Sequence, residues 1–120
     1  MFELTVQDRI SSAHFLRGYN GPCQDLHGHT WKIEVVLLSS QLNELGLVMD
    51  FRELKVKLKD FLKPLDHVCL NELPSFKDVN PSTENLAQYI YRGFSKACVP
   101  LKLKQVRVWE SEITSIIYYE

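Results

Sequence analysis

Two histidines placed two residues apart, His27 and His29, constrain the folding of this chain more than any other feature. Side chains two positions apart lie on the same face of an extended strand, whereas on a helix they point in widely different directions. The next segment continues the alternation, because Trp31, Ile33 and Val35 are apolar and charged residues separate them. The pattern therefore predicts a strand over about residues 30–38. His27 and His29 would lie on the same face of the extended chain as Trp31, Ile33 and Val35.

A third histidine, His14, ends an earlier alternating segment. The apolar residues Phe2, Leu4, Val6 and Ile10 share one parity with Ser12 and His14, so polar residues replace apolar ones at the end of this segment. Residues 18–22 contain two glycines, an asparagine and a proline, which favour a loop. Such a loop would fold the second strand back beside the first, so that His14 reaches the other two histidines.

Three neutral imidazoles that converge on one point are a suitable ligand set for Zn²⁺. Three protein ligands leave a fourth position for water or substrate, as in catalytic zinc sites. Cys23 lies four residues before His27 and leaves two possibilities open. It could complete a closed, structural site as a fourth ligand, or it could act beside the metal as a reactive thiolate.

The rest of the chain predicts two helices followed by two strands. Asp50 is a candidate N-cap for a helix that ends at Pro64, and a second helix begins near Ser82 and ends at Pro100. Alternating segments at about 105–111 and 113–119 predict the last two strands. The order strand, strand, helix, helix, strand, strand predicts an α+β fold, a four-stranded antiparallel sheet with both helices on one face.

Length and composition predict one domain over residues 1–120 and exclude several classes of protein. The net charge of -1 argues against a general nucleic-acid-binding surface. No apolar run approaches the roughly 20 residues that span a bilayer, and the alternating, acidic N-terminus does not resemble a signal peptide. Three cysteines are too few for a disulfide framework, so we expect a cytoplasmic location.

Two further positions are candidates for chemistry. His67 follows Asp66, and a carboxylate beside an imidazole could orient it as a general acid or base, although a surface histidine is the simpler interpretation. Glu110 shares the parity of apolar residues in a predicted strand. It could hold paired N–H donors of a ligand such as a pterin, or it could mark the strand end and face water. Glu84 is by itself most simply a partner of a helix N-terminus.

Six short motifs follow one another along the chain: Ser12-Ala13-His14, Cys23-Gln24-Asp25-Leu26-His27-Gly28-His29, Val48-Met49-Asp50-Phe51, Leu65-Asp66-His67 with Leu70-Asn71, Asn80-Pro81-Ser82-Thr83-Glu84, and Val108-Trp109-Glu110-Ser111. These motifs, in this order, resemble the 6-pyruvoyltetrahydropterin synthase superfamily. Within it the resemblance is strongest to the bacterial 6-carboxytetrahydropterin synthases of queuosine biosynthesis, because three residues separate Cys23 from His27, whereas the mammalian-type pyruvoyl enzymes have a longer gap. A third group, which acts in folate synthesis, carries Glu in place of this cysteine.

This resemblance implies the tunnelling fold (T-fold), in which subunits join their sheets into a barrel. The assembly would be a homo-oligomer based on trimers, commonly a hexamer, with active sites between subunits. The partner molecule would be a small pterin triphosphate, with no nucleic acid and no membrane involved.

The resemblance also implies a reaction and the residues that perform it. A zinc-dependent lyase of this kind would convert 7,8-dihydroneopterin triphosphate to 6-carboxy-5,6,7,8-tetrahydropterin, with loss of acetaldehyde and triphosphate. The implied residues are His14, His27 and His29 for zinc, Cys23, Asp66 and His67 for proton transfer, and Glu110, Ser82 and Glu84 for substrate binding. Two alternatives remain: a 6-pyruvoyltetrahydropterin synthase, which only eliminates triphosphate, and a non-enzymatic module that binds partners and has a closed His₃Cys zinc site.

Overall fold

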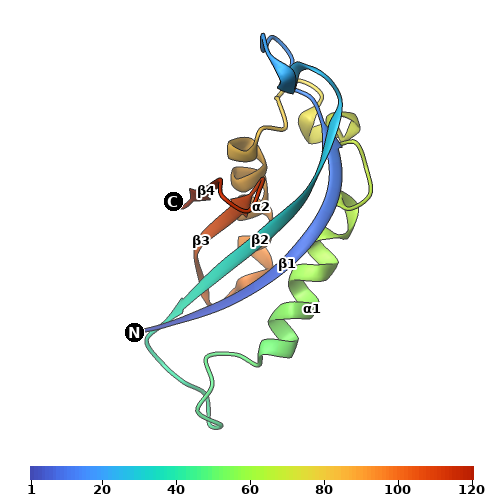
Figure 1. Cartoon of the computed structure of the whole chain (residues 1–120). Coiled ribbons are helices and arrows are strands. Elements are labelled where there is room, and N and C mark those ends of the chain that lie inside the picture. The colour runs from blue at the N-terminus through green and yellow to red at the C-terminus, as the bar shows by residue number, and fades with distance from the viewer.

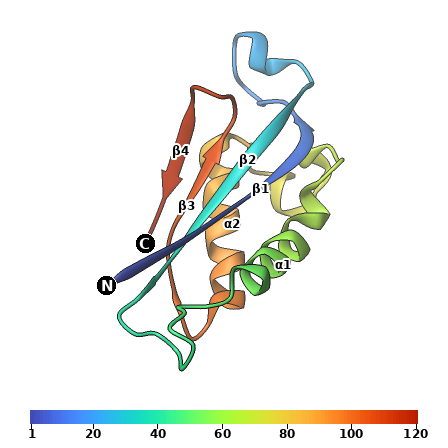
Figure 2. The same cartoon turned by 60° about the horizontal axis from the view of Figure 1, so that its bottom comes forward.

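The computed structural model describes residues 1–120, which form a four-stranded antiparallel sheet with two helices on one face (Figures 1 and 2). The strand order in the sheet is β1-β2-β3-β4. The predicted α+β fold and its order of elements are confirmed. The elements are β1 (Phe2–His14), β2 (His27–Ser39), α1 (Phe51–Leu62), α2 (Thr83–Cys98), β3 (Lys102–Trp109) and β4 (Ser115–Tyr118), with short 3₁₀ turns at Pro22–Gln24, Lys63–Leu65, Leu70–Glu72 and Pro74–Phe76.

Strands β1 and β2 are the longest elements and give the molecule its elongated shape, 53 × 25 × 22 Å. Each has 13 residues, and an extended chain of that length spans about 43 Å. Figure 1 shows them as a long curved pair that extends beyond β3 and β4. The ends of β1 and β2 that carry the histidines therefore project past the two shorter strands.

The alternation in β1 and β2 separates a buried face from an exposed one, as the pattern predicts. Even positions of β1 and odd positions of β2 face the helices and are mostly buried, whereas Glu3, Thr5 and Gln7 on the other face of β1 are exposed. Helix α1 contributes Leu54 and Leu58, both fully buried, to the same core. The sheet thus has one face covered by helices and one face that is uncovered in the single chain.

Side chains cap both helices where the sequence predicts their starts. The Asp50 carboxylate accepts a hydrogen bond from the Arg52 N–H at 2.8 Å, and the Ser82 hydroxyl accepts one from the Asn85 N–H at 3.2 Å. These bonds satisfy N–H groups that have no partner inside the helix. Neither helix has the length and apolar character needed to cross a bilayer.

The strand boundaries differ from the prediction at two places that matter for the site. Strand β2 begins at His27 rather than near Thr30, so both of its histidines lie inside the strand. Strand β3 ends at Trp109, which places Glu110 in the turn between β3 and β4 rather than within a strand. A hydrogen bond from the Glu110 N–H to the Thr114 carbonyl, at 3.2 Å, closes this turn.

Candidate active site

The three histidines predicted as ligands lie together at one end of the β1–β2 pair. His14 is directly opposite His27 in the strand register, and His29 is opposite Ser12. One ring nitrogen from each histidine lies within 4.8 Å of the corresponding nitrogens of the other two. Trp31, two residues further along β2, packs its ring against those of His14 and His29, with centroids 4.9 and 5.0 Å away.

Hydrogen bonds to backbone carbonyls determine the tautomers of two of these imidazoles. Nδ1–H of His14 donates to the Pro81 carbonyl at 2.6 Å, and Nδ1–H of His27 donates to the Asp25 carbonyl at 2.7 Å. In the neutral ring, Nε2 then carries the free lone pair, which is the usual arrangement for a histidine that binds a metal through Nε2.

Two of the Nε2 atoms, those of His14 and His29, are buried and have no hydrogen-bond partner in the chain. Burial lowers the pKa of both histidines, and for His14 this effect exceeds the opposing one of its bond to Pro81. A buried nitrogen lone pair without a partner is unfavourable unless a ligand completes it. The residues present therefore fit a Zn²⁺ ion, for which three neutral imidazoles are a well-suited donor set.

Cys23 lies next to this histidine cluster without belonging to it. The group of side chains close enough to share a metal consists of His14, His27 and His29 and contains no cysteine. Cys23 is a free, half-buried thiol in the 3₁₀ turn Pro22–Gln24. This arrangement argues against Cys23 as a fourth ligand of a closed site and favours the thiol as a separate group.

A cavity of about 300 Å³ joins the histidine cluster to most of the other predicted residues. Its size is at the lower end of the range for small-molecule sites. Five residues that the sequence predicts for the site line its wall: His14, Cys23, Ser82, Glu84 and Glu110. The structure thus brings together residues from β1, the 3₁₀ turn, the start of α2 and the β3–β4 turn.

Glu110 is held in this cavity by a residue that the sequence prediction missed. Oε2 of Glu110 accepts a hydrogen bond from the Thr83 hydroxyl at 2.9 Å. The carboxylate is half-buried rather than facing water. No local signal identifies Thr83 as its partner, because the two residues are 27 positions apart and meet only through the packing of α2 beside the β3–β4 turn.

Asp66 and His67 form the predicted pair, with Oδ2 of Asp66 3.0 Å from Nδ1 of His67. The other oxygen, Oδ1, accepts the Ser11 N–H at 2.8 Å, and this bond is the main reason why the pKa of Asp66 is lowered. His67 has a positive φ of 57° and an 80% exposed side chain. A non-glycine residue in this left-handed conformation is uncommon and often occurs at functional sites.

Within one chain, however, His67 and Cys23 do not share a cavity. His67 lines a second, more open hollow together with His29 of the histidine cluster and with Ser11 and Thr30. Ser11 and Thr30 belong to the strand positions that face away from the helices. A single chain therefore presents the Cys23 thiol and the His67 imidazole in two different hollows.

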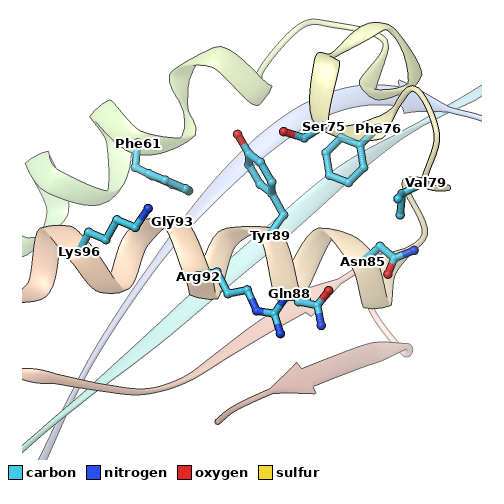
Figure 3. Close-up of a pocket in the computed structure, with 10 residues that line it drawn as sticks. All are labelled: Phe61, Ser75, Phe76, Val79, Asn85, Gln88, Tyr89, Arg92, Gly93 and Lys96. Atoms are coloured by element: carbon cyan, nitrogen blue, oxygen red, sulfur yellow. The ribbon is translucent and has the colours of Figure 1, made fainter.

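Another cavity, of about 460 Å³, contains none of the predicted site residues. It lies along α2, where Phe61 of α1 and Phe76 and Tyr89 contribute aromatic rings (Figure 3). Gly93 allows this close packing of α1 on α2, because a Cβ at that position would lie 2.7 Å from the Phe61 ring. The candidate site is thus the smaller cavity beside the histidines.

Comparisons with known proteins show what the whole chain is similar to. The model of the 6-pyruvoyl tetrahydropterin synthase family matches residues 3–120. A 6-carboxy-5,6,7,8-tetrahydropterin synthase of Haemophilus influenzae is 31% identical, with all of both chains aligned. A dihydroneopterin monophosphate aldolase of Pyrococcus furiosus is 39% identical over 72% of each chain.

Solved structures show the same fold. The 6-pyruvoyl tetrahydropterin synthase of Caenorhabditis elegans superimposes with a TM-score of 0.88 at 24% identity, covering 99% of this chain and 95% of the other. The match of the family model extends over nearly the whole sequence. The chain therefore belongs to the 6-pyruvoyl tetrahydropterin synthase family.

Proposed function

We propose that this protein is a zinc-dependent 6-carboxytetrahydropterin synthase. It would convert 7,8-dihydroneopterin triphosphate to 6-carboxy-5,6,7,8-tetrahydropterin, with loss of acetaldehyde and triphosphate, in queuosine biosynthesis. The observation that carries the proposal is the cavity where the buried His14 imidazole, whose Nε2 has no partner, comes together with a free thiol and a half-buried carboxylate. The full-length similarity to the Haemophilus influenzae enzyme of that name supports the choice of reaction.

His14, His27 and His29 would hold the zinc ion through their Nε2 atoms. When bound, Zn²⁺ would act as a Lewis acid toward hydroxyl groups on the side chain of the substrate. The carbonyls of Pro81 and Asp25 would keep the rings of His14 and His27 oriented, because each fixes the N–H of the nitrogen that does not bind the metal.

Cys23 and Glu110 would act on the pterin itself. Cys23, as a thiolate, would move a proton at the pterin side chain, for which its place in the cavity beside His14 is suitable. Glu110 would accept two parallel N–H bonds from the amino-pyrimidine edge of the pterin. Thr83 holds one oxygen of that carboxylate and so limits its rotation, while Ser82 and Glu84 form part of the wall.

Asp66 and His67 would be the second acid–base group, and they would act in an oligomer. The different hollows of His67 and Cys23 in one chain support active sites that form between subunits of a trimer-based assembly such as a hexamer. Asp66 would keep Nδ1 of His67 protonated, which leaves Nε2 to exchange a proton with the substrate. The three unpaired cysteines support a reducing, cytoplasmic location.

Incubation of the zinc-loaded protein with 7,8-dihydroneopterin triphosphate, followed by mass spectrometry, tests the reaction. Carboxytetrahydropterin together with acetaldehyde is the expected result. Pyruvoyltetrahydropterin alone would instead assign the sister activity that the family is named after. Untouched substrate at full zinc occupancy would contradict both and favour a non-enzymatic zinc module. A parallel incubation with dihydroneopterin monophosphate tests the activity of the Pyrococcus furiosus relative.

A further inference from the structure

The edge of β1 that faces away from β2 is hydrogen-bonded at alternate residues from Ser11 onward. The N–H of Ser11 donates to the Asp66 carboxylate at 2.8 Å, and the Ser11 carbonyl accepts the His67 N–H at 2.6 Å. The N–H of Ala13 donates to the Val68 carbonyl at 2.9 Å. Up to this point the partners come from one segment, residues 66–68.

Two asparagine side chains continue this series of hydrogen bonds beyond the end of β1. Asn71 accepts the Phe15 N–H through Oδ1 and donates to the Phe15 carbonyl through Nδ2, both at 2.9 Å. Asn80 does the same for Arg17, at 2.8 and 3.0 Å. A side-chain amide presents a donor and an acceptor side by side, as a peptide group does, so each asparagine takes the place of a neighbouring strand residue.

Leu16 lies between Phe15 and Arg17, the two residues that the asparagines bind, and its backbone is bonded to Cys23. The N–H of Leu16 donates to the Cys23 carbonyl at 2.8 Å. Residues 15–17 lie beyond the end of β1, but their bonds follow the pattern of a strand, in which successive residues direct their hydrogen-bonding groups to opposite edges. The two asparagines therefore occupy one edge of residues 15–17, and the backbone of Cys23 occupies the other.

The Arg17 side chain reinforces this attachment. Its guanidinium donates weak hydrogen bonds to the carbonyls of Asn71, at 3.4 Å, and Val79, at 3.5 Å. It also lies 5.6 Å from the centre of the Phe15 ring. Asn71 itself is only 6% exposed, and a buried amide with both of its groups satisfied rigidifies its surroundings.

We propose that Asn71 and Asn80 are positioning residues that hold Cys23 in the cavity beside the histidines. They act through the backbone of residues 15–17, and neither one lines that cavity. The placement of the thiol follows from these contacts alone, whereas its catalytic consequence rests on the proposed function. Without the two asparagine side chains, only the weak bonds of the Arg17 guanidinium would tie residues 15–17 to the segment 71–80, while Cys23 would stay bonded to Leu16.

The test compares Asn80→Ala with Asn43→Ala in the zinc-loaded, full-length protein. Asn43 is a matched control, because its Oδ1 also accepts two backbone N–H groups, those of Leu45 and Leu47, in a loop that contains no candidate site residue. The readout is the rate at which iodoacetamide alkylates Cys23, measured by peptide mass mapping with Cys69 as internal reference. Burial raises the pKa of the Cys98 thiol to about 11, so it should not react in the folded protein.

We expect Asn80→Ala to increase the alkylation rate of Cys23 several-fold, to leave that of Cys69 unchanged, and to retain zinc. Asn43→Ala should match the wild type. Asn71→Ala should behave like Asn80→Ala, and the half-exposed position of Asn80 keeps the test available if the buried variant fails to fold. Equal Cys23 rates in Asn80→Ala and Asn43→Ala would overturn the proposal.

Turnover provides a second, separate readout. If the wild type forms carboxytetrahydropterin, Asn80→Ala should lower kcat by about 100-fold with little change in KM, as expected when a reacting group is displaced by about 1 Å. An unchanged kcat would overturn the positioning role. If the wild type proves inactive, the proposed function fails, and the alkylation comparison still decides whether the asparagines position the thiol.

Discussion

At the scale of single residues, His14 and His29 have buried Nε2 atoms that only a ligand from outside the chain could satisfy. His67 differs from them, because its side chain is 80% exposed and it does not belong to the cluster. The three histidines come from two strands, and in the proposed zinc site each would contribute one of three nitrogen donors.

This difference predicts opposite results for two alanine variants. His29→Ala removes one of three nitrogen donors and should lose most of its bound zinc, whereas His67→Ala should keep a full complement because it removes no donor. Zinc per chain, measured by mass spectrometry of elements after dialysis against a weak chelator, checks this. Full zinc retention in His29→Ala, or loss of zinc in His67→Ala, would show that the ligand set is different.

The three histidines could be predicted from sequence, because strand periodicity is local and places His27 and His29 on one face. The partner of Glu110 could not be predicted, since Thr83 reaches it only through tertiary packing. The same is true of the clamps on Phe15 and Arg17, because nothing near Asn71 or Asn80 in the sequence indicates which backbone groups they bind.

At the scale of elements, the start of α2 and the β3–β4 turn meet at Glu110, and they should bind the substrate together. Glu110→Gln replaces one accepting oxygen with an amide donor and should raise KM by about tenfold or more, because a charge-assisted hydrogen bond is worth about 1.5–3 kcal/mol. Glu112→Gln in the same turn is the control, since Glu112 is exposed and outside this cavity. Steady-state kinetics would count against the assignment if both variants showed the same KM.

The contact of the 66–68 segment with β1 should depend on pH. The Ser11 N–H lowers the pKa of Asp66 in the folded chain, so the unfolded chain binds more protons at low pH. The stabilisation by Asp66 is therefore present above the ordinary carboxyl pKa of about 3.9 and is lost as the pH falls through the lower folded value.

The expected result is that Asp66→Asn loses stability less steeply than the wild type below about pH 5. Denaturant unfolding at a series of pH values measures this, and at neutral pH the variant should be less stable than the wild type. Parallel curves for the two proteins over the acid range would mean that Asp66 does not contribute to acid sensitivity.

The elements themselves were predicted in the correct order, since caps and hydrophobic periodicity are local signals. The error at Glu110 has a physical reason. In the sequence, Glu110 continues the parity of Val106 and Val108. A closed turn forms at this point instead, with the hydroxyls of Ser111 and Thr114 2.7 Å apart. The hydrophobic pattern of a sequence does not predict hydrogen bonds of this kind, because they depend on turn residues rather than on apolar ones.

At the scale of the whole molecule, one face of the sheet is uncovered and the two proposed parts of the active site lie in separate hollows. If sites form between subunits, Cys23→Ala and His67→Ala should each be inactive alone and should recover part of the activity when their subunits are mixed. Each mixed oligomer would contain some interfaces that join an intact Cys23 to an intact His67.

Dissociation of the two variants together in mild denaturant, followed by refolding and a turnover assay, measures this recovery. Separately refolded variants serve as the control, and light scattering should give three or six times the 14.0 kDa chain mass. A monomer, or a mixed oligomer without any recovered activity, would be incompatible with shared sites.

The central claim is that zinc on the three histidines makes this chain a 6-carboxytetrahydropterin synthase. Its most direct test is the release of acetaldehyde from 7,8-dihydroneopterin triphosphate by one protein sample in three states: zinc-loaded, stripped by a chelator, and reloaded with zinc. We predict acetaldehyde and carboxytetrahydropterin in the first state, neither in the second and both again in the third. Equal product in the stripped and loaded samples, or none in any state, would contradict the claim.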